Sequence, residues 1–233
     1  MRRLSAVVFD VDGTLVDSER DGHRVAFNIA FEQAGLPDRW DVVTYGRLLR
    51  IAGGAKRLAC WFEENGRSPG EARRLADRLH ARKTEIMRGL VEDGAILARP
   101  GATRLLDELA GAGIAAHVAT TGTRAWVEPL LSALFGARFD AIVTGTEVAD
   151  LKPSPAVYQE VLCRTGLPAE RTVAIEDSAN GVRAAVAAGI RCLVAHNSYT
   201  EDHDFSGATL VTEGLNDPAL VAWFHQRLST HHR

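Results

Sequence analysis

Seven polar side chains follow four of the predicted strands, either directly or in the next loop. They are Asp10, Asp12, Thr120, Thr121, Lys152, Glu176 and Asp177. In a parallel sheet the carboxyl ends of the strands meet at one crevice, where ligands bind. The sequence therefore predicts a group of carboxylates gathered around one lysine ammonium.

The chemistry of such a group follows from its charges. Asp10 could be a nucleophile, a metal ligand or both, and Asp12, one strand period further on, could give or take a proton. Two like charges about 4 Å apart cost roughly 4 kcal/mol at an effective dielectric near 20, so the cluster needs protons or a cation. Oxygen ligands with room for water favour Mg²⁺. Together with Lys152, that ion would suit a phosphate dianion, which predicts phosphoryl transfer to aspartate. A solvated Asp-Gly turn is the alternative for Asp10–Gly13 alone.

The elements that must position these residues alternate along most of the chain. Strands are predicted at 7–9, 114–119, 141–143, 172–175, 190–195 and 209–211, with helices between them. This alternation indicates a parallel sheet with right-handed crossovers. Between the first two strands lies a stretch with helical periodicity only, at 18–34, 45–49, 55–63 and 71–90. We predict an α/β fold: a Rossmann-like core (1–16 plus 96–233) with an inserted α-helical cap domain (17–95).

Composition narrows the range of partners and compartments. The net charge of −3 and pI near 6.2 give no electrostatic argument for binding nucleic acid or an anionic membrane. No run reaches the roughly 18 apolar residues that a membrane span needs. The N-terminus enters the first strand with no room for a signal peptide, and the three cysteines lack metal-like spacing. A cytoplasmic protein is expected.

At this point the residues resemble a known family. Asp10-Val11-Asp12-Gly13-Thr14, Thr120, Lys152 and Glu176-Asp177 have the order and spacing of the four motifs of haloacid-dehalogenase-superfamily phosphatases. The resemblance covers the whole chain. It implies that Asp10 attacks phosphorus, Asp12 protonates the leaving oxygen and then activates water, and Thr120 and Lys152 hold the phosphoryl group. It also implies Mg²⁺ ligation by Asp10, the Asp12 carbonyl, Asp177 and Glu176, and a cis Lys152-Pro153 bond.

A narrower likeness is to CbbY-type proteins, phosphatases of xylulose 1,5-bisphosphate. The segments that carry it are Glu19, His23–Asn28, Gly53-Gly54, Ala119–Thr121, Lys152–Pro155 and Tyr199-Thr200. One departure is that Ala55 stands where a lysine is expected after the glycine pair. Lys56 or Arg57 must then grip the second phosphate, or the substrate differs.

The predicted substrate-binding residues of the cap each have a structural alternative. Glu19 and His23 lie four apart on one helix face and could hold sugar hydroxyls or form a solvated pair. Gly53 and Gly54 could let backbone amides approach a phosphate or could form a turn between helices. Lys56 and Arg57 could bind the second phosphate or be surface charges. Thr121 could contact the ligand or end a strand.

The resulting hypothesis is a monomeric Mg²⁺-dependent sugar-phosphate phosphatase. Three other enzymes with the same core remain as alternatives. They are a β-phosphoglucomutase, a phosphoglycolate phosphatase and a phosphonatase, the last of which would need Lys56 as a Schiff-base lysine. A non-catalytic regulator that binds a phosphosugar is the alternative from another class, although it would have no need of Asp12 as an acid.

Overall fold

The computed structural model describes residues 4–228, apart from the side chain of Asp21, and divides into two compact units. The sheet unit comprises Met1–Asp17 and Leu97–Arg233, and the helical unit comprises Ser18–Ile96. These boundaries lie one residue from those predicted from the sequence. No helix within the described residues combines the length and apolar character needed to cross a bilayer.

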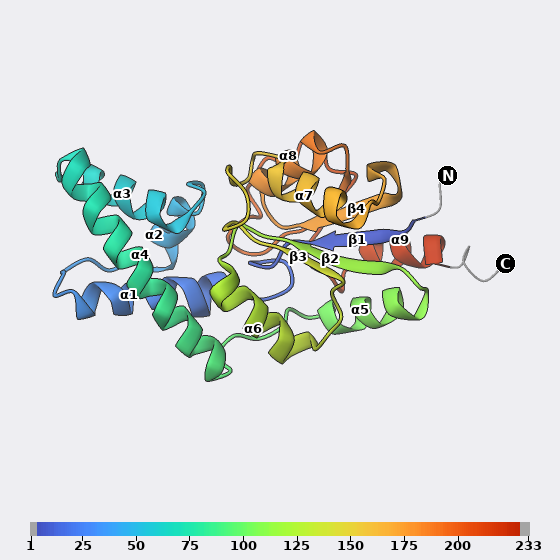
Figure 1. The fold of residues 1–233 in the computed structure, drawn as a ribbon, viewed down its shortest axis with the longest axis horizontal. Helices are drawn as coiled ribbons and strands as arrows, with labels where there is room; N and C mark the ends of the chain where they lie inside the picture. The colour runs from blue at the N-terminus through green and yellow to red at the C-terminus, as the bar shows by residue number, and fades with distance from the viewer. Residues whose placement is uncertain (1–3, 229–233) are drawn as a thin grey trace. The chain divides into compact units, whose positions relative to one another are not determined.

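The sheet unit is built on six parallel strands in the order β3-β2-β1-β4-β5-β6 (Figure 1). Their bounds are β1 Ala6–Phe9, β2 Ala115–Ala119, β3 Ala141–Val143, β4 Thr172–Glu176, β5 Arg191–Ala195 and β6 Leu210–Thr212. The predicted α/β class and the edge strand near 210 are confirmed. β1 lies at the centre, with Phe9 opposite Val118 on β2 and Ile175 on β4.

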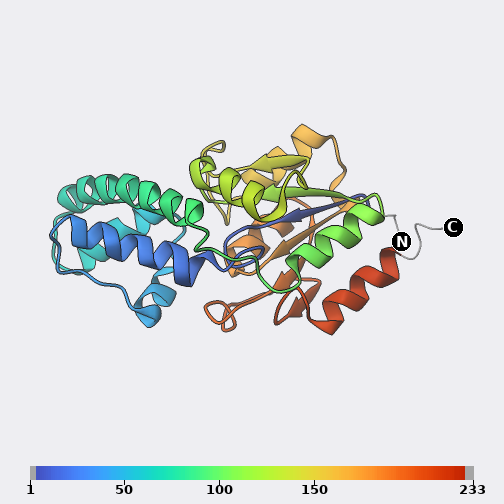
Figure 2. The same cartoon turned by 90° about the horizontal axis from the view of Figure 1, so that it is seen from below.

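Helices cover both faces of this sheet, as Figures 1 and 2 show. On one face, α7 (Ala156–Thr165) and α8 (Ala179–Ala187) bury Tyr158 and Val182 against the strands. On the other lie α5 (Ala102–Gly111), α6 (Arg124–Phe135) and α9 (Pro218–Leu228). All four residues of β1 are buried, as expected for a central parallel strand covered on both sides.

The helical unit consists of η1 (Glu19–His23), a π-helical turn, followed by four α-helices. These are α1 Arg24–Gln33, α2 Val42–Leu48, α3 Gly54–Glu64 and α4 Pro69–Glu92. The helix predicted over 18–34 is present, and its first turn is π-helical. The core of the unit is aromatic: the ring of Trp40 lies 4.7 Å from that of Phe27 and 5.1 Å from that of Phe31, centroid to centroid.

Candidate active site

The carboxyl ends of β1 and β4 bring three acids together. Asp10 follows β1 directly, Glu176 is the last residue of β4, and Asp177 comes next. All three are buried, and one carboxylate oxygen from each lies within 4.8 Å of the others. The convergence expected from the sequence is therefore present in the structure.

Lys152 joins two of these acids from the loop after β3. Its Nζ donates to Asp10 Oδ1 and Glu176 Oε1, both at 2.6 Å, and to the Ala119 carbonyl at 2.8 Å. Tyr158 on α7 donates its hydroxyl hydrogen to the same Glu176 oxygen at 2.5 Å. The lysine side chain is 4% exposed, so water screens these contacts little. The Lys152-Pro153 peptide bond is cis, which confirms that expectation.

Burial disfavours the ionised form of two carboxyl groups in this cluster. Burial raises the pKa of Asp10, the charge of Asp12 adds to the effect, and Lys152 opposes it. Burial likewise raises the pKa of Glu176 to about 7, again against the influence of Lys152. Burial disfavours the ammonium of Lys152, but the two carboxylates outweigh it and raise its pKa. The site therefore favours binding of a proton or a cation.

The donor set fits Mg²⁺ in particular. Asp10, Glu176 and Asp177 offer only oxygen ligands, and three carboxylates within 4.8 Å of one another are an arrangement that a hard divalent ion stabilises. Glu176 Oε2 is also buried without a hydrogen-bond partner. The carboxylate of Asp177 is oriented by Asn197, whose Nδ2 donates to its Oδ2 at 2.8 Å.

Gly13 allows this close packing beside the first strand. Its φ of +79° is a conformation that favours glycine, and a Cβ there would overlap the Asp177 carboxylate. The Gly13 carbonyl accepts hydrogen bonds from Asn197 and from Arg99. Arg99 also donates to the carbonyls of Ala195 and His196, both at 2.8 Å, and so ties the turn after β1 to the end of β5.

The remaining predicted residues of the sheet unit lie at the same strand ends. Thr120 follows β2, is fully buried, and its Oγ1 accepts from the Gly122 amide at 3.0 Å. Thr121 is half-buried, and its carbonyl packs against Gly145 in the loop before Lys152. Asp12 is half-buried in the turn that begins after β1 and acts electrostatically on Asp10.

Among the described side chains of the helical unit, cations and an acid lie around η1. Lys83 on α4 lies with its Nζ 2.6 Å from His23 Nδ1, and both side chains are buried. Glu19 accepts from the Tyr45 hydroxyl at 2.5 Å, and Arg57 donates to that hydroxyl oxygen at 3.2 Å. Burial, together with the charge of Lys83, lowers the pKa of His23 to about 3. His23 is thus neutral at pH 7.

The two cations expected after the glycine pair differ in their surroundings. Arg57 is buried and donates to the carbonyls of Leu48 and Ile51 at 3.0 and 3.2 Å, whereas Lys56 is exposed. Gly53 precedes α3 with a φ of +87°, and Gly54 is its first residue. Arg57 therefore has a structural role within the helical unit, independent of any ligand.

Comparison with known proteins decides the family. A family model described as haloacid dehalogenase-like hydrolase matches residues 4–189. The chain belongs to this family. It is 44% identical to Protein CbbY of Cupriavidus necator over 225 residues, covering 93% of this chain and 87% of the relative. Against Protein CbbY of Cereibacter sphaeroides the identity is 43%, with 88% and 90% covered.

Solved structures of relatives share the fold of this haloacid dehalogenase-like hydrolase. CbbY from Rhodobacter sphaeroides in complex with phosphate has a TM-score of 0.82 at 39% identity, covering 91% of this chain and 95% of that one. An Asp-to-Asn mutant of that protein, solved in complex with xylulose 1,5-bisphosphate, has the same TM-score at 38% identity and the same coverage. The enzyme class expected from the sequence, a phosphoric monoester hydrolase, is supported by these relatives.

Sequence reasoning missed several polar residues of these two groups. Asn197 comes two residues after β5, so the strand-end argument could have found it. Lys83 interrupts the buried stripe of α4 that includes Ala76, Leu79 and Met87, which is a readable signal. Tyr158 had no such signal, because it lies on the buried face of α7 with Val157 and Val161, where an aromatic residue suggests the core.

Proposed function

We propose that this chain hydrolyses a sugar bisphosphate through a phosphorylated Asp10, with xylulose 1,5-bisphosphate as the preferred substrate. The observation that carries the proposal is the buried cluster in which Lys152 joins Asp10 to Glu176. The relative solved with xylulose 1,5-bisphosphate supports the choice of substrate. Cytoplasmic location and a monomeric state stay predictions.

In the first half-reaction a carboxylate oxygen of Asp10 forms a bond to phosphorus while the bond from phosphorus to the ester oxygen breaks. The electron pair stays on the leaving sugar oxygen, which takes a proton from Asp12. In the second half, Asp12 takes a proton from a water molecule as the water attacks phosphorus. Inorganic phosphate leaves and the Asp10 carboxylate is regenerated.

Lys152 and Thr120 hold the phosphoryl group during both halves. The ammonium of Lys152 donates its three hydrogens to protein acceptors, so it would act on the phosphoryl oxygens through its charge, which is in place before charge builds there. The Thr120 hydroxyl, which accepts from the Gly122 amide, keeps its own hydrogen to donate.

Asp10, Asp177, the Asp12 carbonyl and Glu176 would hold Mg²⁺. When bound, the ion offsets the surplus negative charge, favours ionised Asp10 and neutralises the substrate phosphate. The closeness of the three carboxylates and the raised pKa of Asp10 support this assignment.

We assign the choice of sugar phosphate to the helical unit. Lys83 and Arg57 are candidates for the grip on the second phosphate, with Lys56 and the amides of Gly53 and Gly54 as further contacts. Glu19 and His23 would hold sugar hydroxyls. Lys83 and Arg57 are both buried basic side chains, and a bisphosphate would provide a second anion for them.

Phosphate release with Mg²⁺ tests the proposal on four compounds: xylulose 1,5-bisphosphate, ribulose 1,5-bisphosphate, phosphoglycolate and β-glucose 1-phosphate. We expect kcat/KM for the xylulose compound to exceed that for the ribulose epimer by ~10-fold or more, because hydroxyl placement is read by hydrogen bonds. Preference for phosphoglycolate or glucose 1-phosphate would refute xylulose 1,5-bisphosphate as the preferred substrate, while the proposed phosphorylation of Asp10 would stand. No turnover of any of the four would favour the regulator.

A further inference from the structure

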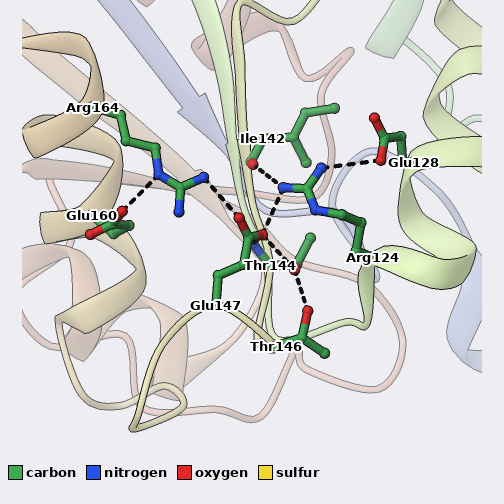
Figure 3. Close-up of polar contacts among 8 residues, drawn as sticks. All are labelled: Arg124, Glu128, Ile142, Thr144, Thr146, Glu147, Glu160 and Arg164. Carbon is green, nitrogen blue, oxygen red and sulfur yellow. Dashed lines mark hydrogen bonds and ion pairs between the residues drawn. The ribbon is translucent and has the colours of Figure 1, made fainter.

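Glu147 lies in the loop between β3 and Lys152, five residues before the lysine, and is the most heavily bonded carboxylate of that loop (Figure 3). Its Oε2 accepts from the Thr144 amide at 2.9 Å and from the Thr144 hydroxyl at 2.7 Å. Arg124 donates to the same oxygen at 2.7 Å, and Arg164 donates to Oε1 at 2.8 Å. The side chain thus closes its own loop and joins it to two helices.

The two arginines come from elements that flank the candidate active site. Arg124 is the first residue of α6 and directly follows the loop that carries Thr120. Its guanidinium also donates to the Ile142 carbonyl on β3 at 2.7 Å. Arg164 lies in the last turn of α7, on the other side of Glu147 in Figure 3.

A backbone contact links the same two loops. The Gly145 amide donates to the Gly122 carbonyl at 3.0 Å. The loop that leads to Lys152 therefore contacts the loop that carries Thr120. A Cβ at Gly145 would also clash with the Thr121 carbonyl, which shows how closely the two segments pack. Together with Glu147, this contact fixes the start of the segment that ends at Lys152.

We propose that Glu147 is a positioning residue: held by Arg124 and Arg164, it sets the place of Lys152 relative to Asp10. The proposal rests on the proposed function, in which the Lys152 ammonium holds the transferring phosphoryl group. A misplaced lysine keeps its charge but loses its alignment, and small displacements of this kind cost large factors in rate.

Glu147 stays ionised at neutral pH and so keeps its bonds to Arg124 and Arg164. It is partly buried, and its bonds to Thr144, Arg164 and Arg124 outweigh that burial and lower its pKa to about 2. Bonds between a carboxylate and a guanidinium are stronger than neutral ones and are directional. Glu147 is 21% exposed, whereas Glu128, the helical partner of Arg124, is 57% exposed.

Glu128 and Glu160 provide matched controls. Each pairs with one of the same arginines in an i,i+4 contact on a helix surface, Glu128 with Arg124 and Glu160 with Arg164. Glu128→Gln and Glu160→Gln therefore remove one carboxylate from the same guanidinium groups without touching the loop. Thermal unfolding of all variants shows whether each is folded.

The experiment combines hydrogen exchange of the 143–152 segment with the kinetics of phosphate release. In Glu147→Gln we expect faster amide exchange in this segment and a kcat lower by ~10-fold or more, with neither change in the two controls. In a Lys152→Ala background the added Glu147→Gln change should cost little more, because its effect passes through the missing ammonium.

Two results would overturn the proposal that Glu147 positions Lys152. One is a Glu147→Gln enzyme whose kcat equals that of the wild type. The other is a full, additive loss in the Lys152→Ala background, which would show that Glu147 acts through other groups. A wild-type enzyme that releases phosphate from no sugar phosphate would instead refute the proposed function, and the two failures are thus distinguishable.

Discussion

At the scale of single residues, the buried ammonium of Lys152 is the main electrostatic contact of the candidate active site. Its ammonium donates to two buried carboxylates and a carbonyl. Removing one partner of a buried ionic group leaves the others uncompensated, whereas removing an exposed charge changes little. We therefore expect the stability of the sheet unit, and the proposed chemistry, to depend on this side chain.

We expect Lys152→Ala to lower kcat for phosphate release by ~10²–10³-fold, to a residual rate that can still be measured, and to lower the free energy of unfolding by about 3–5 kcal/mol in chelator. Urea unfolding measures the second effect. Lys56→Ala, at an exposed lysine, is the control and should stay within about 0.5 kcal/mol of the wild type. An unfolding free energy unchanged in Lys152→Ala would show that the buried ion pairs contribute nothing net.

His23 makes a second prediction at this scale, in the helical unit. Its folded pKa of about 3 lies below the ordinary value of 6.5. Below pH 6.5 the unfolded chain binds a proton that the folded protein does not, so stability falls as the pH decreases towards 3. From pH 7 to pH 5 this histidine should cost about 2 kcal/mol.

Urea unfolding at the two pH values, with wild type and His23→Gln, measures that cost. The variant should lose less stability between pH 7 and pH 5 than the wild type. His225→Gln, at a side chain that is 57% exposed, is the matched control and should keep the wild-type difference. Equal pH dependence in wild type and His23→Gln would contradict the account of the Lys83–His23 contact.

At the scale of elements, the first turn of α8 is shaped by the site rather than by helix propensity. Gly181 lies inside this helix, where alanine is normally preferred by about 1 kcal/mol. A Cβ at Gly181 would overlap the carboxylate of Glu176, which is fixed by Lys152 and Tyr158. Close approach of helix and strand therefore requires glycine at this position.

Gly181→Ala should accordingly destabilise the protein, by about 1–3 kcal/mol, and reduce phosphate release. Gly89→Ala offers a control of opposite sign, because Gly89 lies inside α4 with nothing within 4 Å of an added Cβ. That variant should be more stable by about 0.5–1 kcal/mol. A stabilised Gly181→Ala would refute the steric argument.

The helices and strands also show which contacts could be predicted from the sequence. Strand periodicity and motif spacing predicted the parallel sheet and the meeting of Asp10, Lys152 and Glu176, because parallel strand ends have one edge in common. They could not predict that Glu176 belongs to β4 itself or that Tyr158 donates to it. Such contacts depend on how α7 packs on the sheet, and no local pattern encodes that packing.

At the scale of the whole molecule, we propose a division of labour between the two units. The sheet unit holds the reacting groups, and the helical unit holds Lys83 and Arg57 for the second phosphate. Substitution in the helical unit should then change the choice of substrate more than the chemistry.

Lys83→Met tests this division. We expect KM for xylulose 1,5-bisphosphate to rise by ~10-fold or more, since a charged hydrogen bond is worth about 1.5–3 kcal/mol. Hydrolysis of p-nitrophenyl phosphate, which has one phosphate, should be nearly unchanged. Arg82→Met, at an exposed neighbour on α4, is the control. Equal losses on both substrates in Lys83→Met would contradict the assignment.

Trapping the phosphorylated enzyme tests the central claim most directly. The enzyme is mixed with xylulose 1,5-bisphosphate and Mg²⁺, quenched in acid within one turnover, and digested for peptide mass spectrometry. We expect the mass of one phosphoryl group on the peptide that contains Asp10, and neither label nor phosphate release in Asp10→Asn. Phosphate release that continues in Asp10→Asn, with no labelled peptide from the wild type, would contradict it.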